Sequence, residues 1–316
     1  MSKAAKSKVS LFLSFLILLS YSCEEPIDLD IAVPDAQIVV TSNFSPSQSF
    51  QVTISKSKYI LSPEANEYVN NATVRITDAQ GNSLEELQLN NARIPYYQSK
   101  RITPQSGQFY RIEVDIPEQL PISAESTIPY PVPLKSIRMD TLEMFGSEED
   151  MIYKIAVTVQ FDDPIGVQDY YHLSLYNQVP ASEETPLEGF QDDETIGHTL
   201  TPLTPLESDE ANPSIVFHYE EGGVLFTDED FDGRQVALKF YSLLNITDAL
   251  EKGNVVGELR TVTKDYYLYH TSLSRQIANK DRPFAEPITV YSNIENALGV
   301  FAGYATYRDS TSILTR

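Results

Sequence analysis

The sequence predicts an all-β protein with a single helix, and three observations lead to this prediction. Short segments in which apolar and polar residues alternate recur along the chain, at spacings of roughly 8–12 residues. Turn-forming segments separate them, such as DAQGN at residues 78–82, where glycine supplies a positive φ. The clearest apolar stripe of an amphipathic helix lies at residues 265–280.

The first predicted domain is a β-sandwich over residues 37–128, in an order that is similar to Ig-like or transthyretin-like modules. Pro129, Pro131 and Pro133 follow it, and alternating prolines favour a stiff, extended segment that interrupts strand pairing. We therefore place a junction at residues 129–133. The alternative is a proline-rich edge of one continuous sandwich. Strands are expected at residues 38–40, 50–55, 72–77, 84–89 and 109–114.

The second predicted domain, residues 134–316, is also β-rich and carries the one helix near residues 265–280. Residues 177–214 have little apolar periodicity and many Pro, Thr and acidic residues, which predicts a long acidic loop or two poorly regular strands. Gly299 and Gly303 lie in the last predicted strand and permit a close approach of another segment. Strands are expected at residues 134–139, 153–161, 170–176, 215–219, 223–226, 235–244, 288–291 and 298–304.

The N-terminal residues have the features of an export signal. Three lysines precede an apolar run that is too short to span a bilayer, so residues 1–22 are predicted to be a signal peptide. Ser20 and Ser22 precede the single cysteine, Cys23, in a pattern that resembles a bacterial lipobox, from which bulky Tyr21 departs. We predict that Cys23 is lipidated and that residues 23–36 form a lipidated acidic linker. The alternative is an ordinary signal peptide followed by an unpaired thiol.

The chain is strongly acidic, with a formal net charge of −22. Nucleic acid and anionic lipid surfaces would repel it, so we expect no nucleic-acid partner and a membrane contact through the N-terminal lipid. Between Lys154 and Arg234 the sequence contains 18 Asp and Glu but no Lys or Arg. Such a stretch attracts a cationic partner or collects cations, or it serves only solubility.

One local constellation has the spacing of a calcium loop. Asp228, Asp230 and Asp232 occupy its first, third and fifth positions, and Gly233 permits the sharp turn at the sixth. The pattern then departs, because Lys239 stands at the twelfth position, where a calcium loop has a bidentate Glu. Ca²⁺ is therefore a candidate ligand here, a solvated acidic turn is the alternative, and no other cofactor is expected.

No recognisable catalytic motif is present. The sequence contains no Gly-x-Ser-x-Gly elbow, no His-Glu-x-x-His helix and no glycine-rich phosphate loop. The four histidines lie on separate predicted elements without metal-site spacing. We therefore expect a protein that is not an enzyme, with a hydrolase built on paired carboxylates as the catalytic alternative.

Short motifs in three parts of the chain resemble those of one family. They are NATV at residues 71–74 and GQFY at 107–110, LFTD at 225–228 and FDG at 231–233, and DRPFAEP at 281–287 with VYSNIEN at 290–296. This set resembles the domain-of-unknown-function 4249 family of Bacteroidota lipoproteins, and departs from it at Ala297, where glycine is more usual. The resemblance covers nearly the whole chain after Cys23 and supplies no catalytic residues.

The resemblance implies an outer-membrane lipoprotein that is commonly encoded beside a TonB-dependent receptor. The acidic residues after Cys23 resemble the signal that sends such lipoproteins to the cell surface. We therefore expect a surface-exposed, non-catalytic binding or accessory subunit of a TonB-dependent nutrient-uptake system, with that receptor as its partner. A structural or assembly subunit of an envelope complex is the first alternative.

Two tripeptides resemble the O-glycosylation sequon of exported Bacteroidota proteins. They are Asp140-Thr141-Leu142 and Asp309-Ser310-Thr311. Such tripeptides also occur often by chance. Thr141 and Ser310 are thus candidate modification sites.

Overall fold

The described part of the protein begins after the predicted export signal. The computed structural model describes residues 35–46, 48–58, 65–147, 150–180, 198–203, 207–208, 215, 217–220, 223–246, 253–279 and 288–312. The predicted signal peptide 1–22, the lipidation site Cys23 and most of the linker 23–36 lie outside these residues, as does most of the predicted acidic loop. Among the described residues, no helix combines the length and apolarity that crossing a membrane would need.

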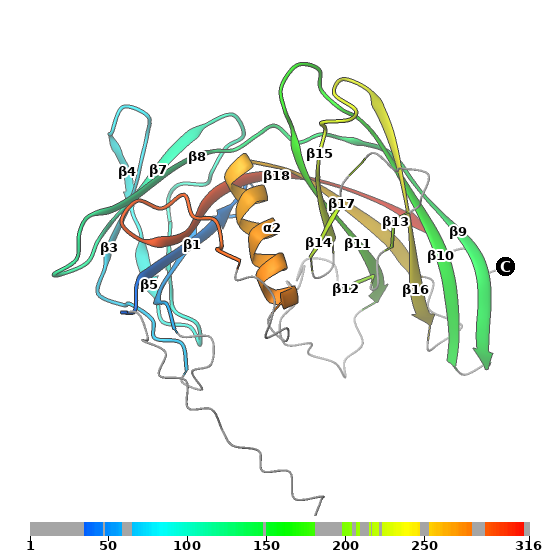
Figure 1. Ribbon diagram of the computed structural model, residues 1–316, viewed down its shortest axis with the longest axis horizontal. Coiled ribbons are helices and arrows are strands. Elements are labelled where there is room, and N and C mark those ends of the chain that lie inside the picture. Colours follow the sequence, from blue (N-terminus) through cyan, green and yellow to red (C-terminus); the bar gives the residue numbers. More distant parts are fainter. Residues whose placement is uncertain are drawn as a thin grey trace, which may run out of the picture. The chain divides into compact units, whose positions relative to one another are not determined.

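The described strands form three sheets (Figure 1). The largest has ten strands in the order β14 (His218–Glu220), β15 (Gly223–Thr227), β11 (Tyr170–Pro180), β17 (Asn254–Val262), β18 (Leu298–Ser312), β1 (Ile38–Phe44), β2 (Gln51–Lys56), β6 (Tyr96–Gln98) and β5 (Gln88–Asn90), with β12 (His198–Pro202) beside β11. The second contains β13 (Glu207–Ser208), β16 (Gln235–Ile246), β10 (Asp150–Asp162) and β9 (Leu134–Ser147). The third contains β4 (Ser83–Glu86), β3 (Thr73–Thr77), β7 (Phe109–Asp115) and β8 (Ile122–Thr127). The prediction of a mainly all-β fold with β-sandwich packing is confirmed.

Each small sheet packs against a different part of the large one, so two hydrophobic cores result. In the first core, the ring centroids of Phe44 and Phe301 are 4.5 Å apart and those of Phe44 and Phe50 are 5.0 Å apart. In the second, the inward residues of β10 pack against Tyr171, Leu173 and Leu175 of β11. The period-two patterns of the sequence therefore mark the two buried faces correctly.

The proline-rich segment 129–133 connects these two cores. Ile128 is the last residue of this part of the chain to join the first core, and Val132 is the first to join the second. The end of the chain then returns, because Phe301 and Ala305 of β18 also pack in the first core. Residues 36–316 thus form one compact unit, in which the predicted second domain, 134–316, contributes to both cores.

The return of the chain depends on a parallel pairing of β1 with β18, in which Val40 lies opposite Gly299. Gly299 has a φ of +116°, and a Cβ atom there would lie 2.0 Å from the carbonyl oxygen of Val40. A side chain at this position would separate the two backbones. The expected close approach at the C-terminal glycines is therefore confirmed.

Residues 288–291 do not form the strand that their alternation predicts. Its backbone instead forms hydrogen bonds with the side chains of Ser272 and Gln276, which lie on the predicted helix. The backbone N–H of Tyr291 donates to Ser272 Oγ over 2.9 Å, and Gln276 Nε2 donates to the carbonyl of Ile288 over 3.2 Å. The prediction of a strand was wrong because local apolar alternation cannot show where backbone groups find their partners.

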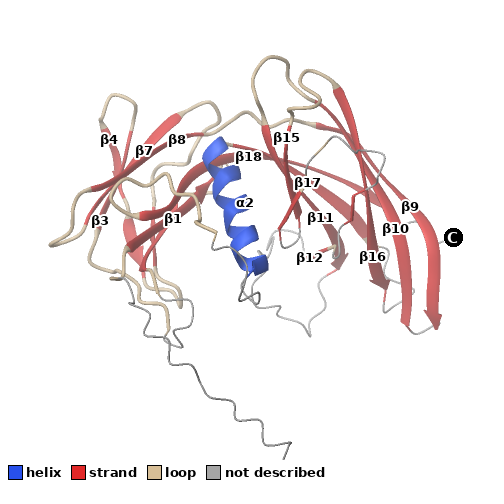
Figure 2. Cartoon of the chain, in the orientation of Figure 1, coloured by secondary structure: helices blue, strands red, loops and turns tan. Residues whose placement is uncertain are grey.

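The predicted helix is present as α2 (Lys264–Asn279), and it lies on the large sheet (Figure 2). Its Tyr266 is 2% exposed and packs in a third apolar cluster with Leu225, Val262, Val300 and Ala302 from three strands of that sheet. The helix therefore covers the face opposite the second core. The prediction of one helix near residues 265–280 is confirmed.

Glu85 of β4 holds the chain segment that follows β6. Its side chain is 3% exposed, and its carboxylate accepts hydrogen bonds from the backbone N–H groups of Lys100, Arg101 and Ile102 over 2.8, 3.1 and 3.0 Å. Burial raises the pKa of Glu85, but these donors and the Arg101 charge outweigh it, so the pKa lies below its ordinary value of 4.5. The ionised form thus stabilises the fold.

We expect Glu85→Gln to lower the free energy of unfolding by about 2 kcal/mol at neutral pH. Because the folded pKa is lowered, the wild-type advantage is complete above pH 4.5 and is lost as the pH falls through the folded pKa. Urea unfolding over an acid pH series measures this difference, with exposed Glu86→Gln as the control. A difference that stays constant into the acid range would contradict the prediction.

Candidate metal centre

Two sheet-to-sheet connections meet at one end of the second core. The first runs from β10 to β11 and carries Asp163 and Asp169 directly after and before these strands. The second runs from β15 to β16 and begins with Asp228. Because β10 and β16 belong to one sheet and β11 and β15 to the other, both connections cross between the layers at this corner.

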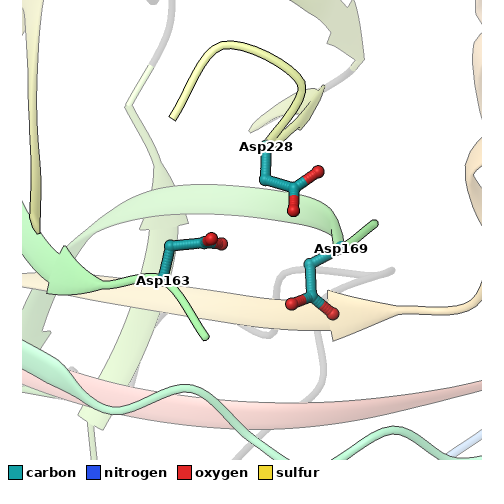
Figure 3. Close-up of side chains that lie close together, drawn as sticks. All are labelled: Asp163, Asp169 and Asp228. Atoms are coloured by element: carbon teal, nitrogen blue, oxygen red, sulfur yellow. The ribbon is translucent and has the colours of Figure 1, made fainter. Parts of the chain in front are cut away.

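Asp163, Asp169 and Asp228 form an acidic cluster (Figure 3). One carboxylate oxygen from each lies within 4.8 Å of those of the other two. Asp163 is 5% exposed, Asp228 is 1% exposed and Asp169 is half-buried. The cluster is therefore largely closed to solvent.

The surrounding structure fixes the position of Asp163. Its Oδ1 accepts a hydrogen bond from the hydroxyl of Tyr171 over 2.5 Å, and its Oδ2 accepts one from the backbone N–H of Gly233 over 2.8 Å. Each of these oxygens keeps a further lone pair for another partner.

The turn that begins with Asp228 is anchored to the core by Phe231. The Phe231 ring lies 6.1 Å from that of Phe161, and its backbone N–H donates to the carbonyl of Asp228 over 2.7 Å. Gly233 adopts a φ of +68°, which points its N–H at Asp163. This local geometry aims the Asp228 side chain at the β10–β11 connection.

Asp228 Oδ2 is a buried oxygen that has no hydrogen-bond partner among the described residues. A buried ionised oxygen in this state costs free energy unless it is paired. In the part of the chain that the structure describes, no Lys, Arg or His forms an ion pair with any of the three carboxylates.

The carboxyl groups of the cluster have raised pKa values. Burial raises the pKa of Asp169 to about 6, and the negative charges of Asp163, Asp228 and Asp232 add to this effect. Burial is also the main cause of the raised pKa of Asp163 and of Asp228. The three ionised groups therefore destabilise one another, and a bound cation would remove this repulsion.

The sequence-predicted set of Asp228, Asp230 and Asp232 is only partly brought together. Asp228 joins the cluster, whereas Asp230 is exposed and Asp232 Oδ1 accepts a hydrogen bond from the backbone N–H of Gly166 over 2.8 Å. Asp232 thus holds the β10–β11 connection in place. The carboxylates converge from two connections and not from one loop, because strands flank this turn where a calcium loop has helices.

Sequence reasoning did not single out Asp163 and Asp169. Both lie in the stretch from Lys154 to Arg234 that contains no Lys or Arg, and this was the available signal. It could not select among 18 acidic residues, because the pairing of β10, β11 and β15 decides which of them meet.

The cluster provides oxygen ligands of the kind that hard divalent cations prefer. A raised carboxyl pKa beside other carboxylates is also a requirement of the hydrolase alternative. However, the burial of Asp163 and Asp228 does not suit the binding of a large substrate, whereas their oxygens and that of Asp169 are spaced as the ligands of a single ion would be. The geometry therefore favours cation binding over hydrolysis.

None of the histidines whose side chains the structure describes belongs to the cluster. His172 Nδ1 lies 3.0 Å from the hydroxyl of Tyr266, between the large sheet and α2. Burial lowers the pKa of His172, so the ring is neutral. The ring packs beside that of Tyr266, with the two centroids 6.0 Å apart.

A cavity separate from the acidic cluster lies beside β9, which is an edge strand of the second sheet. This cavity has a volume of about 650 Å³ and is lined by residues 138–144, Tyr153, Thr311 and Ser312. Thr141 is exposed on its wall, and Ser310 is exposed on β18 close to the lining residues. Glycosylation of Thr141 and Ser310 stays a prediction, and so does lipidation of Cys23.

The fold and the site define an all-β protein of β-sandwich type with a buried acidic cluster. Within this class, the chain belongs to the family described as Domain of unknown function (DUF4249), whose pattern matches residues 24–310. This match confirms the family resemblance that the sequence motifs indicate. A comparison with curated proteins finds no match.

Among solved structures, the chain is similar to a crystal structure of a Salmonella alpha-2-macroglobulin variant. The two share 8% sequence identity with a TM-score of 0.22, over 90% of this chain and 15% of the other. This chain thus spans less than a sixth of the length of that protein. A TM-score this low supports no statement about a common function.

Proposed function

We propose that the chain is a lipid-anchored outer-membrane protein, exposed on the cell surface, which acts as a non-catalytic binding subunit. Its partner in this proposal is a TonB-dependent receptor in nutrient uptake. The proposed location and the proposed partner are supported by the residues around Cys23 and by membership of the family. The edge of the second sheet supports the binding role.

That edge is formed by β9, which pairs only with β10 among the described strands (Figure 1). From Arg138 onward it is largely exposed, and it carries Leu142, Met144 and Phe145, which are 47%, 63% and 43% exposed. An unpaired strand edge presents backbone N–H and C=O groups, and exposed apolar side chains beside it favour a protein partner. This exposed edge is the observation that carries the proposal.

A pull-down of the tagged protein from its own membranes in mild detergent tests the proposal. We expect a TonB-dependent receptor to co-purify in equal amount, and to be lost when Cys23→Ala removes the lipid anchor. Met144→Asp should also abolish the association, because it places a charge in the apolar edge. Leu120→Asp is the matched control, since Leu120 is 69% exposed on the connection before β8.

Recovery of the protein alone would contradict the proposal. Recovery with envelope-assembly factors only would favour the structural or assembly subunit. Growth of a deletion strain separates the same two functions. An uptake subunit is needed on one nutrient, whereas a structural subunit is needed on every medium.

A further inference from the structure

We propose that Asp163, Asp169 and Asp228 bind one Ca²⁺ ion, which ties together the two sheet-to-sheet connections at the corner of the second core. The proposal concerns these described residues alone and does not depend on the receptor partnership. Two independent observations carry it: the geometry of the cluster and the state of one buried oxygen.

The geometry of the cluster fits calcium. Ca²⁺ lies about 2.3–2.6 Å from its oxygen ligands, so two ligands on opposite sides of the ion are about 5 Å apart. The three carboxylate oxygens, which lie within 4.8 Å of one another, can therefore surround one such ion. Carboxylate oxygens alone, with no nitrogen or sulfur ligand in the cluster, select a hard cation over zinc or copper.

The second observation is the Oδ2 atom of Asp228. This residue is 1% exposed, and its Oδ2 has no hydrogen-bond partner among the described residues. The side chain extends toward Asp163 and Asp169 (Figure 3). An acidic residue at the surface needs no partner, but a buried carboxylate oxygen beside two other carboxylates needs a positive charge.

The structure around the cluster keeps the ligands in place. Tyr171 and the Gly233 backbone orient Asp163, while Asp232 accepts a hydrogen bond from Gly166 in the middle of the same connection. Hydrogen bonds to a ligand set its orientation and hence the affinity of the site. Bidentate carboxylates and backbone carbonyl groups can supply the further oxygens that Ca²⁺ requires.

The test measures Ca²⁺ binding and thermal unfolding of the full chain in detergent after chelator treatment. We expect one Ca²⁺ per chain and a higher unfolding midpoint in its presence. Asp228→Asn and Asp169→Asn should each weaken binding at least about tenfold. Asp230→Asn is the matched control, because Asp230 lies on the same turn but is exposed. It should bind Ca²⁺ as the wild type does.

A second measurement separates a metal ligand from an ordinary structural residue. Without Ca²⁺, Asp169→Asn should raise the unfolding midpoint by about 2–4 °C, because it removes repulsion from the cluster. With Ca²⁺, the same variant should be less stable than the wild type. This reversal of order requires a cation at the site.

Three results would overturn the proposal. The first is a wild-type chain whose unfolding does not respond to millimolar Ca²⁺. The second is loss of binding in Asp230→Asn with binding retained in Asp169→Asn. This result would place the site in the single loop that contains Asp228, Asp230 and Asp232. The third is Mg²⁺ binding as tight as Ca²⁺ binding, which would contradict the assignment of the ion.

Discussion

Gly299→Ala is expected to lower the free energy of unfolding by about 4 kcal/mol, which is a large part of the stability of an ordinary domain. The new Cβ would lie 2.0 Å from the carbonyl oxygen of Val40, which belongs to the backbone of β1 and cannot rotate away. The φ of +116° adds strain, since side chains rarely adopt it. Only separation of β1 from β18 would relieve both effects.

The large effect follows from the position of this pair in the sheet. β18 pairs with β17 on one side and β1 on the other, so the contact of Val40 with Gly299 joins the strands of the two cores. Separation there would also displace Phe301 from its contacts with Phe44. The loss therefore extends from one residue pair to the first core.

Gly81→Ala is the matched control for this prediction. Gly81 has a φ of +80°, but a Cβ atom there meets nothing within 4 Å. It should cost about 1–2 kcal/mol, from the backbone conformation alone. Urea unfolding followed by circular dichroism measures both variants. Equal losses for the two would contradict the proposed clash with Val40.

Most strands that the sequence predicts have one apolar and one polar face. β7 and β10 alternate in this way, and their buried residues lie on the expected face. The parallel pairing of β1 with β18 could not be predicted, because these strands are separated by most of the chain. Local patterns define strands but do not define their neighbours.

The central strand β17 escaped prediction for a physical reason. This strand is buried on both faces, but Glu258 and Arg260 interrupt the continuous apolar run that is typical of such a strand. The two charges lie two residues apart and therefore on one face, where they compensate each other. Arg308, the register partner of Glu258 on β18, completes the group, and only the sheet order shows this.

The residues of the candidate site were also only partly evident from the sequence. The acidic stretch without Lys or Arg indicates where cations or a cationic partner would collect if it does more than provide solubility, and the calcium-like spacing singles out Asp228, which the structure places in the cluster. Its companions are Asp163 and Asp169 because the β10–β11 connection crosses the corner beside the turn after β15. Such a contact between two loops cannot be predicted from residues that lie far apart in the sequence.

Glu258→Gln is expected to lower the free energy of unfolding by about 3–5 kcal/mol. Glu258 is 1% exposed, and its carboxylate lies 2.6 Å from Arg260 Nη2 and 2.5 Å from Arg308 Nε. The amide keeps the shape but removes the negative charge between two arginines. Arg260, whose side chain is 22% exposed, then remains in the sheet without its counter-charge.

Burial, and not the presence of an ion pair, is the cause of this loss. Glu125→Gln provides the comparison, because Glu125 forms a 2.9 Å pair with Arg111 but its side chain is 53% exposed. We expect Glu125→Gln to cost less than about 1 kcal/mol, since water screens the pair. Urea unfolding of both variants measures the contrast, and similar losses would refute the argument from burial.

The double variant Glu258→Gln with Arg260→Met separates the two contributions to the loss. If the cost arises from the uncompensated guanidinium, removal of that charge should restore much of the stability that the single variant loses. If it arises from the missing carboxylate contacts to Arg308, the double variant should be no more stable. We expect the first result, because Arg260 is the more buried of the two arginines and also donates to the hydroxyl of Tyr266 beneath α2.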